Sequence, residues 1–349
     1  MSEGKSFDYW DYFVRECERA GDAPLYVQIV RGISKDDELK VIASRVTPGQ
    51  PYANIILAAV HYLLLRGDPH PLRKFYPNLN GGHSLSEDAF PLFKDFVDTH
   101  LAELVPLIAN GVTNTNEVAR CSTLHAGFRA VAKEAGEPLN LIEIGPSAGL
   151  NMIWDKYRVR YAQGGKESFV GPADAALTLD CTIRGDTLPP LGPSPKVASR
   201  VGLELNPVDL ADPYWREWLK ALVWPDQVAR FARLEKAIDI RLRETLDIRP
   251  GNALTLLPDA LASVPEDHPV CVYHSYVTYQ FSEAMREALD NILTMTGLRR
   301  PVWRLSAEGT LQNVGEVPLL LSRYRDGTKE TRQLALCHPH GRWLEWQDA

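Results

Sequence analysis

Apolar positions in the first 111 residues recur at the three-and-four spacing of amphipathic helices. The pattern is clearest in three stretches, which are residues 7–21, 54–67 and 88–111. The second of these, "NIILAAVHYLLLRG", is apolar nearly all round, so we expect a buried helix in which His61 is a hydrogen-bonded core residue rather than a ligand. The pattern therefore predicts a helical cap region over residues 1–111.

A further helix is expected over residues 113–136, directly before the pattern changes. Thr115 or Asn116 can cap its start, and Gly136 followed by Pro138 ends it.

From Leu139 onward, short apolar runs alternate with helical patterns, which is typical of a parallel sheet covered by helices. The predicted strands lie within residues 139–144, 199–205, 246–254, 268–281 and 300–309. The predicted helices cover residues 150–161, 215–238 with a break near Pro225, and 282–297. An inserted strand pair is expected at 176–185, and an antiparallel hairpin around "RDGTKETR" near the end of the chain. We therefore predict an α/β domain with a mostly parallel sheet over residues 112–349.

Composition narrows the possible partners of this chain. A net charge of −7 and a pI near 5.8 argue against a general nucleic-acid binder, which would carry a basic surplus. No apolar run is long enough to span a membrane, and the first residues contain no apolar signal core, so we expect a cytoplasmic protein. The five cysteines lie far apart and form no CxxC pair, which favours reduced thiols and no zinc site.

The stretch "LIEIGPSAGLN" (141–151) is the strongest candidate for a ligand site. Glu143 ends an apolar strand, and Gly145 and Gly149 punctuate the turn that follows, where a backbone without side chains lets a ligand approach. The turn lacks the middle glycine of the G-x-G-x-x-G dinucleotide motif. The Glu143 carboxylate would repel a pyrophosphate, whereas it suits a cationic or amine-bearing ligand. The alternative interpretation is a tight turn that carries a surface glutamate.

The turn and the strand pattern resemble those of class I S-adenosylmethionine-dependent methyltransferases. Their motif [D/E]-x-G-x-x-x-G is met by Glu143, Gly145 and Gly149, with Ser147 inside the same turn. The resemblance implies a Rossmann-like, methyltransferase-type sheet with a C-terminal antiparallel hairpin. It also implies S-adenosylmethionine as the cofactor, whose sulfonium and amino group complement Glu143.

Two further positions resemble adenosyl-binding positions of that class. In "VGLELNP" (201–207), Glu204 would accept hydrogen bonds from both ribose hydroxyls, because a carboxylate offers paired acceptors. In "RPGNAL" (249–254), Asn252 stands where the class usually has an aspartate for the adenine amine. The alternatives are a solvent-facing Glu204 and a turn-favouring Asn252 after Gly251.

Most of the chain also resembles a narrower bacterial group, the domain-of-unknown-function family 2332. The resemblance rests on "NIILAAVHYLLLRG", "TNTNEVARC", "LIEIGPSAGLNMIWDKYRVRY", "GLELNPVDL", "WLKALVWPDQVARFARL", "HSYVTYQF" and "RLSAEG". It implies a methyltransferase-type fold and supplies no reaction. Asn252, and Pro146 where alanine is more frequent, depart from the wider methyltransferase pattern.

Candidate catalytic residues follow the fourth and fifth strands of the predicted sheet. "VYHSYVTYQF" carries His274 and Tyr276 in place of the acidic or Asn-Pro-Pro-type motif of amine methyltransferases. His274 could act as a general base near neutral pH, and the alternative is a histidine that only packs beneath the cofactor. Glu308 in "SAEG" is expected to face the same site, with a plain loop carboxylate as its alternative.

The segment "NEVARC" precedes the first strand and is expected to lie across the cofactor. Asn116, Glu117 and Arg120 could bind the carboxylate and amine of a methionine-like tail. The alternative is a capping interaction with a surface salt bridge. His338 and His340 have no carboxylate cluster near them in the sequence, and we predict no metal site.

These observations lead to one main expectation and two alternatives. The main one is an S-adenosylmethionine-dependent methyltransferase acting on a small molecule, with the helical region as a lid or substrate wall. The second is the same fold binding an adenosyl cofactor or a partner without methyl transfer. The third, a nicotinamide-dependent oxidoreductase, is disfavoured by the glycine spacing.

Overall fold

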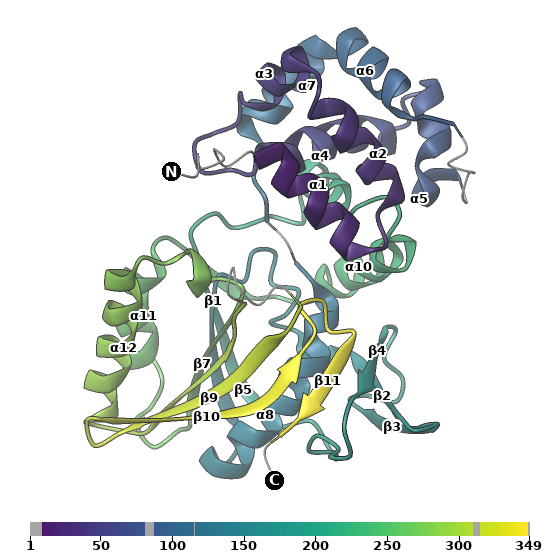
Figure 1. The fold of residues 1–349 in the computed structure, drawn as a ribbon. Coiled ribbons are helices and arrows are strands. Elements are labelled where there is room, and N and C mark those ends of the chain that lie inside the picture. Colours follow the sequence, from purple (N-terminus) through teal and green to yellow (C-terminus); the bar gives the residue numbers. More distant parts are fainter. Residues whose placement is uncertain (1–8, 81–86, 115, 310–314, 348–349) are drawn as a thin grey trace, which may run out of the picture. The chain divides into compact units, whose positions relative to one another are not determined.

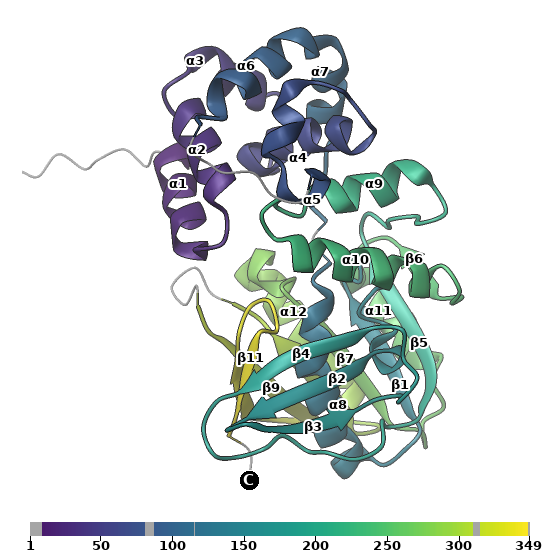
Figure 2. The ribbon, with the colours of Figure 1, turned by 90° about the vertical axis from the view of Figure 1, so that its right-hand side faces the viewer.

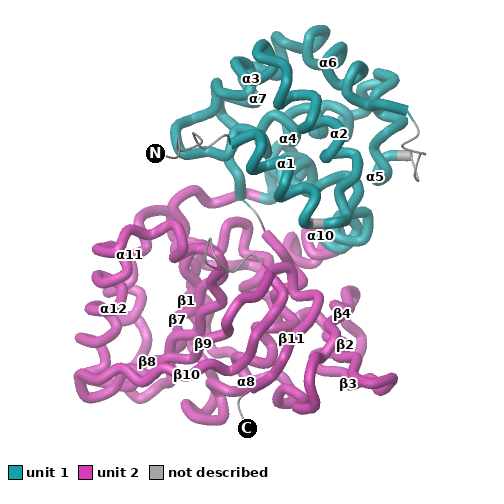
Figure 3. The backbone as a smooth tube through the Cα atoms, in the orientation of Figure 1, with its two compact units in different colours: residues 1–115, 210–235 teal, residues 116–209, 236–349 magenta. Residues whose placement is uncertain are grey.

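A computed structural model describes residues 9–80, 87–114, 116–309 and 315–347. Contacts within the chain divide it into two compact units (Figure 3). The first, called the helical unit below, contains residues 1–115 and 210–235. The second, called the sheet unit, contains residues 116–209 and 236–349. The domain boundary expected between residues 111 and 112 stays a prediction. The compact units divide after Thr115, and the helical unit also includes residues 210–235.

The helical unit consists of short helices, as its three-and-four spacing predicted (Figure 1). Its helices are α1 (Tyr9–Ala20), α2 (Pro24–Ile33), α3 (Asp37–Ala43), α4 (Tyr52–Leu65), η1 (Pro71–Phe75), α5 (Pro77–Asn80), α6 (Phe90–Thr99), α7 (Leu101–Asn110), α9 (Pro213–Ala221) and the first part of α10 (Val228–Arg241). The single helix expected over 88–111 is two helices, which meet at His100. Helices α2 and α3 were not predicted.

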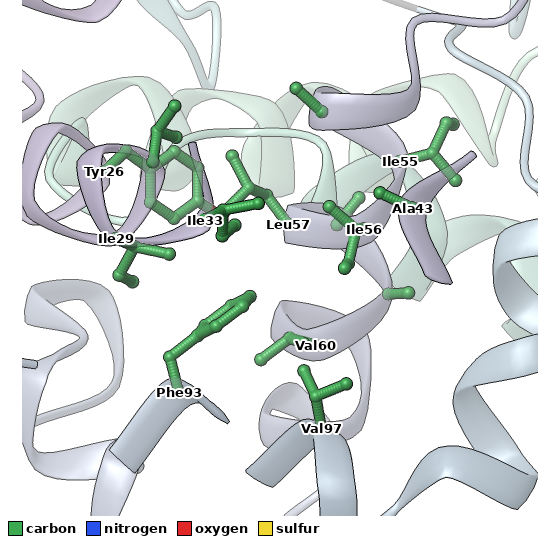
Figure 4. Packing of buried hydrophobic residues seen from close by; sticks show 14 of the residues in the cluster. Tyr26, Ile29, Ile33, Ala43, Ile55, Ile56, Leu57, Val60, Phe93 and Val97 are labelled. Atoms are coloured by element: carbon green, nitrogen blue, oxygen red, sulfur yellow. The ribbon is translucent and has the colours of Figure 1, made fainter. Parts of the chain in front are cut away.

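Helix α4 is the centre of the helical unit. Ten of its fourteen residues are buried, which agrees with its uniformly apolar sequence. Figure 4 shows Phe93 and Val97 of α6 pointing toward Val60 of α4. His61 is also buried, with Nδ1 bonded to the carbonyl oxygen of Ala221 and Nε2 to the Asn78 amide, so it is a core histidine.

The described residues of the sheet unit form one sheet of eleven strands in the order β3-β2-β4-β11-β10-β9-β8-β7-β1-β5-β6. The strands are β1 (Leu139–Ile144), β2 (Arg158–Gln163), β3 (Lys166–Val170), β4 (Thr178–Ile183), β5 (Val197–Glu204), β6 (Asp247–Pro250), β7 (Val270–Ser275), β8 (Val302–Ala307), β9 (Val317–Arg325), β10 (Thr328–Cys337) and β11 (Trp343–Trp346). The strands β6, β5, β1, β7 and β8 are mutually parallel, and β9 and β10 follow as an antiparallel hairpin. The predicted α/β class, largely parallel sheet and antiparallel C-terminal strands are confirmed.

Two predicted elements were wrong. Residues 150–161 form turns, the short helix η3 (Trp154–Lys156) and the start of β2 instead of a helix. Val159 and Tyr161 are buried while their neighbours are not, which is the alternation of a strand. The pair expected at 176–185 is one strand, β4, and the inserted hairpin is β2 with β3.

Helix α8 (Cys121–Ala135) precedes β1 and is covered by the sheet on more than one side. It contacts β4 as well as β8 and β9, strands that lie apart in the sheet order, so the sheet curves around it (Figure 2). Residues 121–131 of the helix are all buried for this reason. The short helix η2 (Val118–Arg120) leads into α8 and is capped by Glu117 rather than Asn116, and Thr115 lies outside the described residues.

The strand order places a topological switch point between β1 and β7. From β1 the chain order runs outward through β5 and β6 on one side, and through β7 and β8 on the other. In open parallel sheets, ligands bind beyond the carboxyl ends of the strands at such a point. Helices α11 (Ala253–Ala262) and α12 (Glu283–Gly297) pack against this part of the sheet, next to the apolar cluster that holds Ile142 and Val272. None of the helices in the described ranges is both long and apolar enough to cross a lipid bilayer.

Candidate functional site

The turn after β1 has an unusual backbone. Gly145, Ser147 and Gly149 have φ values of 70°, 53° and 76°. A Cβ atom at Gly145 would lie 2.6 Å from the Val277 side chain, so glycine is required there both for conformation and for space. Ser147 is a non-glycine residue in the left-handed region, and such strain is concentrated at functional sites.

Glu143 lies at the end of β1 and is only 3% exposed. Its Oε2 accepts a hydrogen bond from the Tyr273 hydroxyl at 2.9 Å, and Tyr273 is the register neighbour of Glu143 on β7. Burial raises the pKa of Glu143 to about 8, an effect that the Tyr273 hydrogen bond opposes and the nearby charge of Glu204 reinforces. At neutral pH this carboxyl group therefore tends to hold a proton.

Glu204 ends β5 and is 9% exposed. Its two oxygens accept hydrogen bonds from the backbone N–H groups of Ser147 at 2.7 Å and Asn206 at 3.0 Å. Neither Glu204 nor Glu143 forms an ion pair with any residue in the described part of the chain. Two buried carboxyl groups thus lie near the ends of adjacent strands.

Ser147 connects these two strands. Its backbone bonds Glu204, while its own hydroxyl oxygen is buried and has no hydrogen-bond partner among the described atoms. The whole residue is 8% exposed. Other buried side-chain atoms of the described structure also have no partner, Ser275 Oγ among them, and a ligand or a water would satisfy the Ser147 hydroxyl.

Asn252 follows β6, close to the same strand ends. The N–H of Gly251 donates to the backbone oxygen of Glu204 at 2.8 Å, which ties the two strand ends together. Asn252 caps α11, since its Oδ1 accepts from the N–H of Leu254 at 2.9 Å, and the side chain is exposed. Oδ1 of Asn252, which was expected to bind an adenine amine, therefore caps a helix in the structure.

His274 is the penultimate residue of β7 and is completely buried. Its Nδ1 lies 2.5 Å from Oε1 of Glu308, and its Nε2 accepts a hydrogen bond from Nε of Arg304 at 2.9 Å. Since Nε2 is an acceptor, Nδ1 carries the proton and donates it to Glu308. Burial lowers the pKa of His274, so the ring remains neutral. The general-base role stays a prediction that these two hydrogen bonds disfavour.

Glu308 follows β8 and organises the loop after β7. Its oxygens accept from the backbone N–H groups of Val277 at 3.1 Å and Tyr279 at 3.2 Å, in addition to His274. Burial raises the pKa of Glu308, but the hydrogen bonds from His274 and the loop backbone outweigh it, and the net pKa lies below the ordinary value. Glu308 is therefore an ionised carboxylate that holds loop 276–279 against the turn at Gly145.

Tyr276 begins this loop with a φ of 60°. The guanidinium carbon of Arg120 lies 4.1 Å from the centre of the Tyr276 ring, a cation–π contact. Nε of Arg120 donates to the backbone oxygen of Pro339 at 2.8 Å. Burial raises the pKa of Tyr276 to about 12, although Arg120 lowers it, so the phenol keeps its proton at neutral pH.

The "NEVARC" segment also contributes an unpartnered atom. Nδ2 of Asn116 is buried without a hydrogen-bond partner in the described structure. Glu117 is buried and lies 3.2 Å from Nδ1 of His340. Nδ1 of His338 accepts from the N–H of His340, so both histidines are engaged locally. Within the ranges that the structure describes, no three His, Cys, Asp or Glu side chains converge on a possible metal position.

The predicted residues thus form two neighbouring groups. Glu143, Gly145, Ser147, Gly149 and Glu204 gather at the ends of β1 and β5, and His274, Tyr276, Glu308 and Arg120 gather around the loop after β7. The contact between Gly145 and Val277 joins the groups. Sequence reasoning missed Tyr273, Arg304 and Val277. For Tyr273 a signal existed, because it precedes His274 on a strand expected beside β1.

Two comparisons with known proteins bear on this site. A family model described as "Uncharacterized protein conserved in bacteria (DUF2332)" matches residues 12–346. No curated protein matches the chain. The match covers both units, including every residue of the candidate site.

Proposed function

We propose, for a chain that belongs to the family of uncharacterised bacterial proteins DUF2332, that its sheet unit binds S-adenosylmethionine and transfers the methyl group to a small molecule. The observation that supports the proposal is the pair Glu143 and Glu204. Both are more than nine-tenths buried, at the ends of adjacent strands, without a cation from the described residues. Burial keeps a proton on Glu143 at neutral pH, because an unpaired buried charge is costly, and a cationic ligand that pairs with Glu143 would displace that proton.

The strand order supports a Rossmann-like, methyltransferase-type fold. Counted along the five neighbouring parallel strands that include β1, β6-β5-β1-β7-β8 is the 3-2-1-4-5 order of doubly wound sheets. The inserted β2, β3 and β4 enlarge the sheet, and residues 145–153 form turns where a helix would follow β1. A pyrophosphate normally rests on the N-terminus of that helix. Its absence in this described segment removes that contact for a dinucleotide, and it also departs from the helix expected after β1 in the proposed fold.

The residues of the turn and of β5 suit an adenosyl ligand. Glu204 uses two acceptor positions for backbone N–H groups and retains further lone pairs for ribose hydroxyls. The Ser147 hydroxyl, buried and unpartnered, can bond a polar group of the ligand. Glu143 would face the cationic part of the ligand. When bound, S-adenosylmethionine supplies a methyl group that its sulfonium makes electrophilic.

Three residues near the loop after β7 would serve the acceptor molecule. Tyr276 retains its proton and can donate a hydrogen bond to an acceptor. His274 and Glu308 hold the loop, and either would need to release an existing hydrogen bond before taking a proton. Val277 fills the space in front of Gly145, so a ligand that reaches this backbone displaces it.

A second candidate function is adenosyl binding without methyl transfer. It is favoured by the engagement of both His274 nitrogens, and by the use of the Asn252 oxygen as a helix cap. In this alternative the strand ends bind the ligand, while the loop after β7 has a structural role only.

Thermal-shift and calorimetric titrations of the full chain test the proposal. S-adenosylmethionine and S-adenosylhomocysteine should raise the melting temperature, because a ligand that binds only the native state stabilises it. NAD should not. Incubation with S-adenosylmethionine and a small-molecule extract should then release S-adenosylhomocysteine, and binding without release selects the second candidate. Tight NAD binding that strengthens in Glu143→Gln would contradict both.

A further inference from the structure

The helical unit carries a surface groove of about 1010 Å³ between the end of α4, helix α7 and the first turn of α9. One wall is aromatic and consists of Tyr62, Tyr214 and Trp215. Pro106 and Leu107 of α7 continue the apolar surface. The volume is at the upper end of the range of small-molecule sites, which combine apolar walls with a few polar groups.

The aromatic wall is rigid. The ring centres of Tyr62 and Tyr214 lie 5.6 Å apart, and Tyr214 stacks on the buried Trp218 with 6.1 Å between centres. Nε1 of Trp218 donates to the carbonyl oxygen of Val112 at 2.9 Å. A ligand therefore meets a preformed surface and need not order these side chains, which reduces the entropic cost of binding.

Two opposite charges in the groove have no ion-pair partner among the described residues. Arg66, at the end of α4, donates a hydrogen bond to the Tyr62 hydroxyl at 3.0 Å. Glu103 of α7 lines the same groove, and both side chains are exposed. The third charged residue, Asp68, lies 2.8 Å from Nε2 of His100 and is already paired. Arg66 and Glu103 form no ion pair in the described structure, although the charge of Glu103, after the Tyr62 hydrogen bond, contributes to the raised pKa of Arg66. Because both side chains line the groove, a ligand bound there meets both charges.

We infer that this groove binds a small zwitterion with a flat apolar body, of the chemical class of aromatic α-amino acids. The ligand carboxylate would meet the Arg66 guanidinium, which presents parallel donors to such a group. The ligand ammonium would meet Glu103, and the apolar body would lie on the rings of Tyr62, Tyr214 and Trp215. A pure anion would face Glu103 unfavourably, and a pure cation would face Arg66. The inference does not depend on adenosyl binding, since its residues belong to the other unit.

Three probes with the same ring test this inference on the full chain. L-phenylalanine carries both charges, 3-phenylpropionate only the carboxylate, and phenethylamine only the ammonium. Tryptophan fluorescence reports binding, and the response should disappear in Trp215→Phe. L-phenylalanine should bind about tenfold more tightly than either analogue, the typical effect of one charge-assisted hydrogen bond.

Two charge variants assign the contacts. In Arg66→Gln, L-phenylalanine should bind no better than phenethylamine. In Glu103→Gln, it should bind no better than 3-phenylpropionate. Arg45→Gln, which removes an exposed arginine that does not line the groove, should leave all three affinities unchanged.

Equal affinity for the three probes in the unaltered protein would overturn the inference, as would the absence of a saturable response at millimolar concentrations. Unchanged discrimination in both glutamine variants would do the same. The comparison of probes on the unaltered chain decides the matter even where a variant fails to fold.

Discussion

Arg304 donates a hydrogen bond from Nε to Nε2 of His274 over 2.9 Å, and this contact determines which imidazole nitrogen carries the proton. The other nitrogen donates to Glu308, and a second guanidinium nitrogen of Arg304 donates to Asp290 at 2.9 Å. A polar chain therefore runs from α12 through β8 and β7 to the loop that covers Gly145. In this series of hydrogen-bonded side chains, His274 acts as a positioning residue for Glu308.

Replacement of Arg304 tests this series of hydrogen bonds. In Arg304→Gln, Nε2 of His274 loses a cationic donor and can take up a proton, so the pKa of His274 should rise. The amides of Val277 and Tyr279 should exchange faster, because Glu308 holds them less firmly. The unfolding free energy should fall by about 1–3 kcal/mol, the usual cost of leaving buried polar groups poorly paired.

Histidine NMR titration, hydrogen exchange and urea denaturation measure these three effects. Arg323→Gln serves as the control, because Arg323 lies on β9 and pairs only with the exposed Glu330 among the described ion pairs. An unchanged His274 titration in a folded Arg304→Gln protein would show that the arginine does not set the tautomer.

Glu204 provides a test of adenosyl binding. Glu204→Gln should weaken binding of S-adenosylhomocysteine by about 1–3 kcal/mol, because an amide offers one acceptor oxygen where the carboxylate offers two. Calorimetry measures the affinity, and Glu287→Gln on the exposed side of α12 is the control. Equal affinities for both variants and the unaltered protein would remove Glu204 from the site.

Glu143 should make stability depend on pH. Its folded pKa is raised from 4.5 to about 8, so the folded state holds a proton that the unfolded state has released. The resulting stabilisation is complete below pH 4.5 and is lost as the pH rises through about 8. Urea denaturation across this range should show a decline that is absent in Glu143→Gln. A decline of the same size in that variant would assign the effect to other groups.

The same proton should affect ligand choice. S-adenosylmethionine carries a sulfonium that S-adenosylhomocysteine lacks. The preference for S-adenosylmethionine should therefore increase as the pH rises toward about 8 and Glu143 ionises. Calorimetry in buffers of different ionisation enthalpy should detect proton release on binding. A preference independent of pH would mean that Glu143 does not face the cation.

Gly145 combines two constraints that can be separated. Gly145→Ala should destabilise the protein by about 1–2 kcal/mol through its positive φ alone, and more because its Cβ would lie 2.6 Å from Val277. Val277→Ala in the same chain should recover the second part and leave the first. Thermal or urea denaturation of both single variants and the double variant measures this coupling. Strict additivity would indicate that Val277 yields freely.

The sequence was sufficient for the general fold because its signals were periodic and local. Alternation of strands and helices after Leu139 predicted the largely parallel sheet, and Pro225 predicted the break between α9 and α10. The segment 150–161 misled because Leu150, Trp154, Tyr157 and Tyr161 also recur at helical spacing. The burial of Val159 and Tyr161 against the rest of the sheet is what makes this segment a strand and not a helix.

The candidate site was less predictable, because its contacts join residues far apart in the chain. Glu143, Ser147 and Glu204 could be named from the ends of predicted strands. The hydrogen-bond partners of His274 could not be named from the sequence. Arg304 reaches His274 from β8 only in the observed register, where Val272 lies opposite Arg304. No local pattern marks a side chain that acts across two strands.

The division of the helical unit between two stretches of chain has a consequence for protein synthesis. Trp218 and Ala221 belong to the same buried cluster as α1, α2 and α4, yet they leave the ribosome after residues 116–209. At a typical 5–20 residues per second, the early helices wait about 5–20 s for these partners. During that interval the nascent chain exposes apolar surface that α9 later covers, and this surface is accessible to chaperones.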